Sequence, residues 1–215
     1  MKLTRTQLFI LIIGLALMSA GVFLVYAGKW LLVENPVPDK LDVVFTFAGD
    51  GARVNYSREL MGRNPAAHWL LSDYKNGYAR LLRKDGFDMN RVSSVDTCSS
   101  TQSEVAVLDS WIKTGKIEKA LMLSHNDGSK TIPASYGKSQ ILHVGLVSSP
   151  YHMRRIQMMV NWTDLRDSVQ FYYLPVPLDR YNWNRKMFGS WWKHKNLRTI
   201  VISELQKIGY FLLTA

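Results

Sequence analysis

Cysteine is the scarcest reactive residue in this chain: Cys98 is the only one among 215 residues. An intramolecular disulfide is therefore excluded, and so is a CxxC redox or zinc motif. A thiol nucleophile at Cys98 remains one interpretation, although a small buried or loop cysteine is the commoner role for such a residue.

Acidic residues are also in short supply. The chain has 17 Asp and Glu against 27 Lys and Arg, which gives a formal net charge of +10. This balance favours polyanionic partners such as lipid head groups or phosphorylated substrates. The sequence has no long Lys/Arg run, zinc-finger spacing or RNA-binding signature, so we expect no nucleic acid partner. No metal-ligand spacing is present either, and we predict neither a metal nor a cofactor.

One long hydrophobic run is present, over residues 8–27. About twenty apolar residues are what a membrane-spanning helix needs. Lys2 and Arg5 precede the run, and they favour an amino terminus on the inner side with the main domain outside. We therefore predict a single-pass anchor. The tripeptide at residues 25–27 also fits a signal-peptide cleavage site, which leaves removal of the segment as an alternative.

Three regions follow from this pattern. Residues 1–28 form the predicted transmembrane anchor, and residues 29–40 a linker in which Pro36 and Pro38 disfavour both helix and central strand. Residues 41–215 form one domain of ordinary size.

Short apolar runs alternate with helical patterns through this domain. The strands are predicted at 42–48, 68–71, 91–95, 141–148 and 169–176, and the helices at 53–64, 74–84, 101–114, 151–162 and 200–213. This order predicts an α/β fold, with a mainly parallel sheet and helices on both faces. A further apolar run at 119–124 competes for the place of the fourth strand, and which run takes it stays open.

The stretch from His143 to Arg155 is the most informative. A buried strand ends in small polar residues, where Ser148 or Ser149 could cap a helix that has Pro150 in its first turn. His152 and Arg155 are three residues apart and share one helical face. With the backbone N–H groups of a helix start, they form a plausible cradle for a phosphate. The alternative is an ordinary strand–loop–helix unit with a solvated basic face.

The first predicted strand ends in a glycine-flanked acid. Gly49, Asp50 and Gly51 would allow the backbone to approach a ligand closely, although the same residues also make a plain turn. Arg58 lies in the helix that follows, and it either lines the pocket or faces water.

Two other strand ends carry polar candidates. Ser72 ends the second strand. Thr101 and Glu104 have capping-box spacing, which accounts for them without any further role. In the functional interpretation, this hydroxyl-rich loop and its carboxylate orient water or bind a substrate.

Residues 180–198 combine basic and aromatic side chains and contain no acid. This composition suits a surface that rests on anionic lipid. Aromatic packing beneath a long loop with solvated charges explains it equally well.

Several of these stretches together resemble one protein family. Residues 147–155 are similar to the signature of YdcF-like proteins, a domain of unknown function that includes the SanA- and ElyC-type envelope proteins. Residues 97–104 resemble the second motif of that family, and residues 47–51 its first glycine turn. Trp191-Trp192 with Glu204 and Lys207 is similar to its tail, so the resemblance spans residues 42–213.

The resemblance implies a Rossmann-like domain anchored in the bacterial inner membrane and facing the periplasm. It implies a role in envelope biogenesis, through peptidoglycan, surface polysaccharide or lipid carrier metabolism, with a poorly defined reaction. The chain departs from the family pattern at Ser72-Asp73-Tyr74, where a glycine pair is usual, and by an insertion after Ser124.

The leading hypothesis is an enzyme that acts on a phosphorylated envelope intermediate. His152 would be the acid or base, with Glu104 and Asp50 orienting water or a metal. The predicted substrate-binding residues are Gly49, Gly51, Arg58, Ser72, Thr101, Ser148, Ser149 and Arg155. The alternative is a non-catalytic module that binds an anionic ligand and assists an envelope assembly complex.

Overall fold

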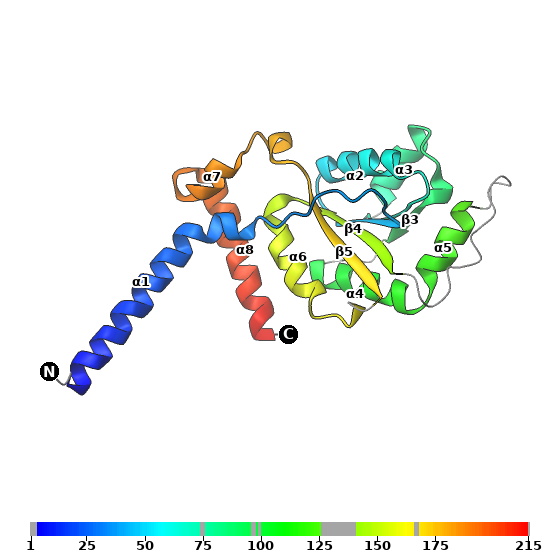
Figure 1. Ribbon diagram of the computed structural model, residues 1–215. Helices are drawn as coiled ribbons and strands as arrows, with labels where there is room; N and C mark the ends of the chain where they lie inside the picture. Colours follow the sequence, from blue (N-terminus) through cyan, green and yellow to red (C-terminus); the bar gives the residue numbers. More distant parts are fainter. Residues whose placement is uncertain are drawn as a thin grey trace.

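A five-stranded, entirely parallel sheet forms the centre of the protein, in the order β3-β2-β1-β4-β5. The computed structural model describes residues 4–73, 76–95, 98, 100–125, 141–165 and 168–214 (Figure 1). The strands are β1 (Val43–Thr46), β2 (His68–Ser72), β3 (Val92–Val95), β4 (Leu142–Ser148) and β5 (Val169–Pro175). The predicted α/β fold with a mainly parallel sheet is confirmed.

Helices lie around this sheet, except for the first one, which projects away from it. They are α1 (Arg5–Leu31), α2 (Gly51–Arg63), α3 (Gly77–Lys84), α4 (Thr101–Lys113), α5 (Lys116–His125), α6 (Met153–Val160), α7 (Arg185–Gly189) and α8 (Lys195–Thr214). The apolar run at 119–124 belongs to α5, so the run at 141–148 supplies the fourth strand. The predicted insertion at 126–140 lies outside the described residues.

Alternate strand residues enter two separate core clusters. Val43, Phe45 and Leu146 pack with residues of α4, α5 and α6. Val44 and Val147 belong to the second cluster, with residues of α2 and α3. Side chains of a strand point alternately to opposite faces, so a strand buried in both clusters needs a continuous apolar sequence.

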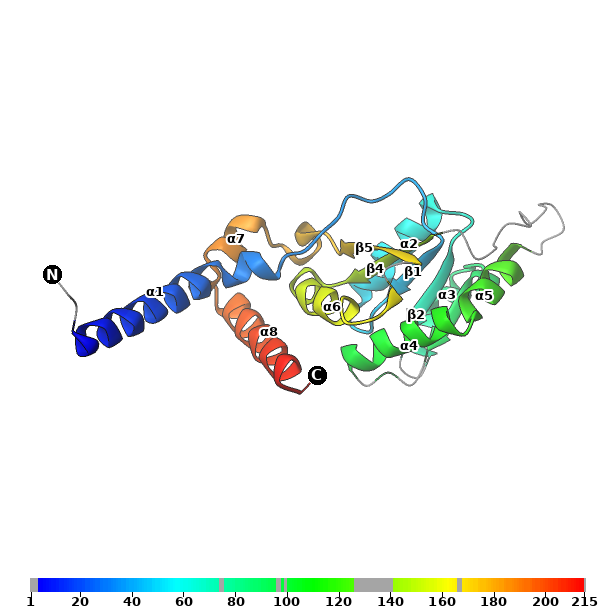
Figure 2. The ribbon, with the colours of Figure 1, turned by 60° about the horizontal axis from the view of Figure 1, so that its bottom comes forward.

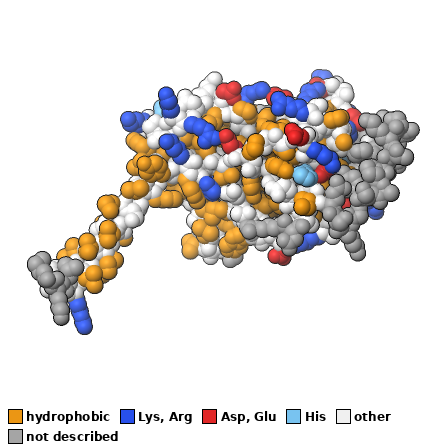
Figure 3. All heavy atoms as spheres, in the orientation of Figure 1, with side chains coloured by type: hydrophobic (Ala, Val, Ile, Leu, Met, Phe, Trp, Pro, Cys, Tyr) orange, Lys and Arg blue, Asp and Glu red, His pale blue; other side chains and the backbone are white. Residues whose placement is uncertain are grey.

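The amino-terminal helix α1 projects away from this domain (Figures 1 and 2). Within the described residues it is the one helix long and apolar enough to cross a membrane. Its 27 residues would extend about 40 Å, more than the hydrocarbon core requires. Figure 3 shows its hydrophobic side chains uncovered along most of its length. The helix continues to Leu31, three residues into the predicted linker.

The last turns of α1 are part of the domain. Ala27 and Leu31 are buried in a third cluster with Phe188, Trp191 and residues of α8. The Trp191 indole Nε1 donates to the Leu24 carbonyl at 3.0 Å. The aromatic residues of the 180–198 stretch therefore include core residues that hold the anchor. Several of its basic side chains, such as Lys186 and Arg198, are exposed.

Arg154 ties α1 to α6. Its Nε donates to the Trp30 carbonyl at 2.9 Å, and its guanidinium lies 5.0 Å from the centre of the Trp30 ring. The neighbouring Arg155 points into the polar cluster described below. Two adjacent arginines of α6 therefore have different partners: Arg154 contacts the anchor, and Arg155 contacts Glu204.

The buried His68 predicts how the stability of the fold depends on pH, independently of any functional site. Its ring nitrogens contact the hydroxyls of Ser124 and Ser93 at 2.8 and 2.9 Å. Burial and the nearby Arg91 charge lower its pKa to about 4, so the unfolded chain binds a proton more readily than the folded protein. We expect the free energy of unfolding to fall as the pH drops from 6.5 to 4, by about 3 kcal/mol. His68→Gln should flatten this part of a urea-unfolding pH profile, and an unchanged slope would refute the assignment.

Candidate functional site

The carboxyl ends of β1 and β4 meet at the centre of the sheet. β1 pairs with β4 and with β2, so the sequence order of the strands reverses beside β1. In open parallel sheets, ligands bind outside the strand ends at such a point. Here the ends of β1 and β4 lead into α2 and α6, whose first turns face this edge.

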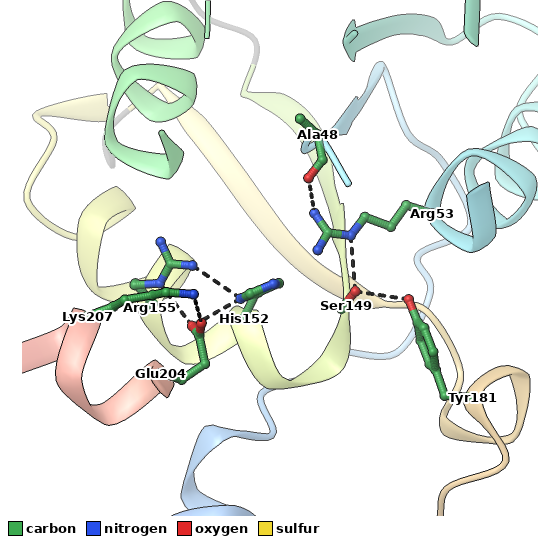
Figure 4. Close-up of polar contacts among 8 residues, drawn as sticks. All are labelled: Ala48, Arg53, Ser149, His152, Arg155, Tyr181, Glu204 and Lys207. Carbon is green, nitrogen blue, oxygen red and sulfur yellow. Dashed lines mark hydrogen bonds and ion pairs between the residues drawn. The ribbon is translucent and has the colours of Figure 1, made fainter. Parts of the chain in front are cut away.

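Glu204 is the centre of the first polar group, which we call the Glu204 cluster (Figure 4). Its Oε2 accepts from Arg155 Nε at 2.9 Å and lies 3.0 Å from His152 Nδ1. Its Oε1 lies 2.9 Å from Lys207 Nζ. The carboxylate is only 1% exposed, so three cationic or hydrogen-bonding groups compensate one buried charge.

Burial and the neighbouring charges determine whether the His152 ring carries a charge. Burial favours the uncharged ring and lowers the pKa of His152, together with Arg53 and Arg155, against the opposing effect of Glu204. Burial acts to raise the pKa of Glu204, but His152, Arg155 and Lys207 outweigh it and lower the value to about 2. We therefore expect an uncharged His152 at neutral pH. We assign its proton to Nδ1, because that tautomer donates to the ionised Glu204, while Arg155 and Lys207 supply the positive charge.

In the assigned tautomer, Nε2 of His152 is an acceptor. Arg155 Nη2 lies 3.2 Å from Nδ1, on the side of the ring that faces Glu204. Among the described residues, none forms a hydrogen bond with Nε2. An imidazole oriented by a carboxylate and open at its other nitrogen is the usual arrangement of a general base.

Arg53 is the centre of a second group, the strand-end cluster. Its Nε donates to Ser149 Oγ at 3.1 Å, and its Nη1 donates to the carbonyls of Phe47 and Ala48. Arg53 lies in the first turn of α2 and is buried. Figure 4 shows His152 between this group and the Glu204 cluster.

A chain of hydrogen bonds extends from Arg53 to Asp50. Ser149 Oγ lies 2.9 Å from the Tyr181 hydroxyl, which donates to both carboxylate oxygens of Asp50 at 3.2 and 3.1 Å. Burial and the adjacent Asp50 raise the pKa of Tyr181 to about 12, so its hydroxyl retains the proton that it donates. Asp50 also caps α2 by accepting from the Arg53 backbone N–H at 3.3 Å.

Glu104 joins the ends of neighbouring strands. Its Oε1 accepts from the Ala48 N–H at 2.6 Å, and it bonds the Ser72 hydroxyl. Burial raises its pKa, against these hydrogen bonds and the charges of Arg53 and Arg155. The predicted capping box is wrong by one position, because Ser100 caps α4 together with Ser103. Glu104 is thereby free to reach the strand ends.

A cavity of about 610 Å³ adjoins the Glu204 cluster between α4, α6 and α8. Arg155 and Lys207 line one part of it, with Thr101 across from them on α4. Met159 and Phe211 give the rest an apolar lining. Thr101 does not cap the helix, but it lines the same cavity as Arg155 of the Glu204 cluster.

Most predicted site residues lie around these two clusters. The predicted sharing of one helix face by His152 and Arg155 is confirmed. Ser149 precedes Pro150 as an N-cap, but its hydroxyl bonds Arg53 and Tyr181 instead of the helix backbone. The buried Ser148 hydroxyl has no hydrogen-bond partner among the described residues, so it could receive a ligand group.

Arg58 is the exception. Its guanidinium forms an exposed ion pair with Asp85, at 3.0 Å, and contacts neither cluster. Arg53, about one and a half turns earlier in α2, lies at the site where Arg58 was predicted. The sequence pattern assigned no role to Arg53, although an arginine three residues after the Asp50 cap was a usable signal.

Gly49, which precedes α2, and Gly51, the first residue of that helix, offer a matched test. A Cβ on Gly49 would lie 2.4 to 2.7 Å from the Arg53 guanidinium, whereas one on Gly51 meets nothing within 4 Å. Gly49→Ala must displace Arg53 from its three acceptors, so we expect a loss of about 1–3 kcal/mol in the free energy of unfolding. Gly51→Ala should stay within about 0.5 kcal/mol of the wild type. Urea denaturation measures both, and equal effects would contradict this role of Gly49.

Comparison of the chain with protein-family models, curated proteins and solved structures finds no match.

Proposed function

We propose that this protein is a membrane-anchored, YdcF-like envelope protein that binds and hydrolyses a phosphorylated intermediate at the ends of β1 and β4. The observation that carries the proposal is the His152 ring, held through Nδ1 by the buried Glu204 with guanidinium groups on either side. We interpret the parallel sheet as Rossmann-like, with helices on both of its faces. The family assignment rests on the motif resemblance.

In this proposal, the cations hold the anion and the imidazole moves the proton. Arg155 and Arg53 bind phosphate oxygens, and the Ser148 hydroxyl adds a donor. His152 Nε2 takes a proton from water as its oxygen attacks phosphorus. The bond from phosphorus to the leaving oxygen breaks, and solvent protonates that oxygen. Glu204 stabilises the resulting imidazolium, and Glu104 orients the water.

The contacts of α1 favour an uncleaved anchor. Cleavage after Ala27 would remove Leu24, whose carbonyl accepts from Trp191, and would remove the buried Ala27 side chain. We therefore place the domain beside the bacterial inner membrane. The Lys2 and Arg5 charges support its location on the periplasmic side.

Phosphate release from polyprenyl phosphates and diphosphates by the full-length protein in detergent tests the enzymatic role. We expect turnover by the wild type and its loss in a His152→Ala, Arg155→Ala double variant. His143→Gln is the matched control, because His143 lies at the opposite end of β4 and contacts Tyr172. Equal turnover by the wild type and the double variant would refute the assigned roles.

A second candidate is a binding module without chemistry. Its support is that Asp50 and Glu104 already accept from backbone N–H groups and from Tyr181 and Ser72. In that case Asp50→Asn and Glu104→Gln variants would keep ligand binding and fully rescue a deletion strain. Failure of the wild type to bind any anionic ligand would count against both candidates.

A further inference from the structure

The last two turns of α8 expose an apolar surface. From Ile208 to Thr214 the helix contains no charged residue. Tyr210 is 71% exposed, Leu212 51% and Leu213 88%. Phe211 points the other way, into the main core, where its ring lies 5.1 Å from that of Trp162. The inward Phe211 fixes the helix end, so its neighbours are held facing outward.

The opposite end of α8 is joined to the anchor. Leu197 and Val201 share a buried cluster with the last turns of α1. The packing there is close, since a Cβ on Gly28 would lie 2.3 Å from the Phe188 carbonyl and 2.7 Å from the Trp191 ring. Phe188 and Trp191 thus hold the last turns of α1, and α8 packs into the same buried cluster.

The two helices leave this junction toward the same side of the molecule. Figures 1 and 2 both show the amino-terminal end of α1 and the carboxyl-terminal end of α8 below it. In Figure 3, hydrophobic side chains cover the lower part of α8, and Lys and Arg gather on the upper side of the domain. A membrane crossed by α1 would thus face the apolar end of α8.

We propose that the carboxyl-terminal turns of α8 are a second membrane contact, in which Tyr210, Leu212 and Leu213 enter the boundary between head groups and acyl chains. Exposed apolar clusters on helix ends bind this boundary, and a tyrosine suits its depth. Lys207, half-exposed one turn before Phe211, would lie at the head groups. The bilayer is the expected partner because this surface lies on the side to which α1 extends.

The contact would bring the cavity between α4, α6 and α8 to the membrane surface. Tyr210, Phe211 and Lys207 belong both to this helix end and to the lining of the cavity. An anionic group in the head-group layer would then have a short path to Arg155. The membrane contact itself does not depend on catalysis or on the identity of the ligand.

A fluorescent label at Leu213 tests the contact in the full-length protein. The label would be attached to Leu213→Cys in a Cys98→Ser background, and the protein reconstituted into phosphatidylcholine and phosphatidylglycerol vesicles. Leu81→Cys in the same background is the matched control, since Leu81 is 55% exposed on α3. We expect lipid-borne nitroxides to quench the label at 213 several-fold more than at 81, and aqueous iodide to quench it several-fold less.

Two results would overturn the proposal. Equal iodide access at both positions would mean that water surrounds the end of α8. A label shielded from iodide and from lipid nitroxides alike would mean that protein, such as a second copy of the chain, covers it. Leu212→Cys provides a second position should the first variant fail to fold. Phosphate release does not enter the measurement, so failure here is separable from failure of the proposed function.

Discussion

Glu204→Gln is expected to lower the free energy of unfolding by about 3–5 kcal/mol, because it leaves the buried Arg155 guanidinium without its counter-charge. Arg155 Nε and Lys207 Nζ both lie 2.9 Å from this carboxylate. The Gln side chain keeps one acceptor but carries no charge. His152 also loses the group that fixes its Nδ1 proton. We therefore expect phosphate release to fall with stability, since the imidazole can turn or change tautomer.

The matched control is Glu59→Gln. Glu59 accepts from Arg180 at 2.8 Å, but both side chains are about half exposed, so its loss should cost less than about 1 kcal/mol. Urea unfolding of the full-length protein in detergent, followed by tryptophan fluorescence, compares the two variants. Similar midpoints for both would show that burial of Glu204 adds nothing to its ion pairs.

The stability difference between the wild type and Glu204→Gln should depend on pH in a defined direction. The pKa of Glu204 in the folded protein, about 2, lies below its ordinary value of 4.5. Its stabilising contribution is therefore present above pH 4.5 and is lost as the pH falls from 4.5 to 2. The stability gap between wild type and Glu204→Gln should narrow through that window. A constant gap would contradict the lowered pKa.

The sheet could be predicted from the sequence because parallel strands are buried on both faces. Val43 to Thr46 and Val144 to Val147 are continuous buried runs, and their positions were predicted within a few residues. The run at 119–124 was ambiguous for a physical reason. Leu121 is buried whereas Met122 and Leu123 are exposed, as on one face of a helix, but four apolar residues are too few to reveal that period.

The site could be predicted only where its contacts are local. His152 and Arg155 are one helical turn apart, and that spacing alone brings them together. Glu204, in contrast, lies 49 residues after Arg155, and no periodic pattern links them. The family resemblance included Glu204 and Lys207 in its tail without assigning them a role. Residues of a buried ion cluster that come from separate helices need the tertiary structure.

The cap of α4 shows a different limit. Residues 99–103 offer several hydroxyls in succession, and Ser and Thr cap helices with similar strength. Ser100 takes the cap, with Ser103 completing the box. The acid at 104 was thus assigned to the helix start, while in the folded protein it accepts from the β1 end. Because the cap lies at Ser100 and not at Thr101, Glu104 is left to make a long-range contact with Ala48.

Arg53→Met is expected to remove the anchor of the strand-end cluster while keeping the bulk of the side-chain stem. Ser149 Oγ and the Phe47 and Ala48 carbonyls would lose a charged donor. Hydrogen bonds to charged groups contribute about 1.5–3 kcal/mol, so we expect a loss of that size in unfolding free energy. Because Arg53 also faces the proposed anion, we expect pyrophosphate affinity to fall about tenfold or more.

Arg58→Met is the matched control on the same helix. Arg58 pairs with Asp85 at the surface, where both side chains are about half exposed, so the change should cost less than about 1 kcal/mol and leave pyrophosphate binding unaltered. Urea midpoints and isothermal titration calorimetry of the full-length protein in detergent provide the two measurements. The contrast separates a buried guanidinium at the strand ends from a solvated one, although both residues belong to α2. If Arg58→Met weakened binding as much as Arg53→Met, the anion would lie along the exposed face of α2, away from His152.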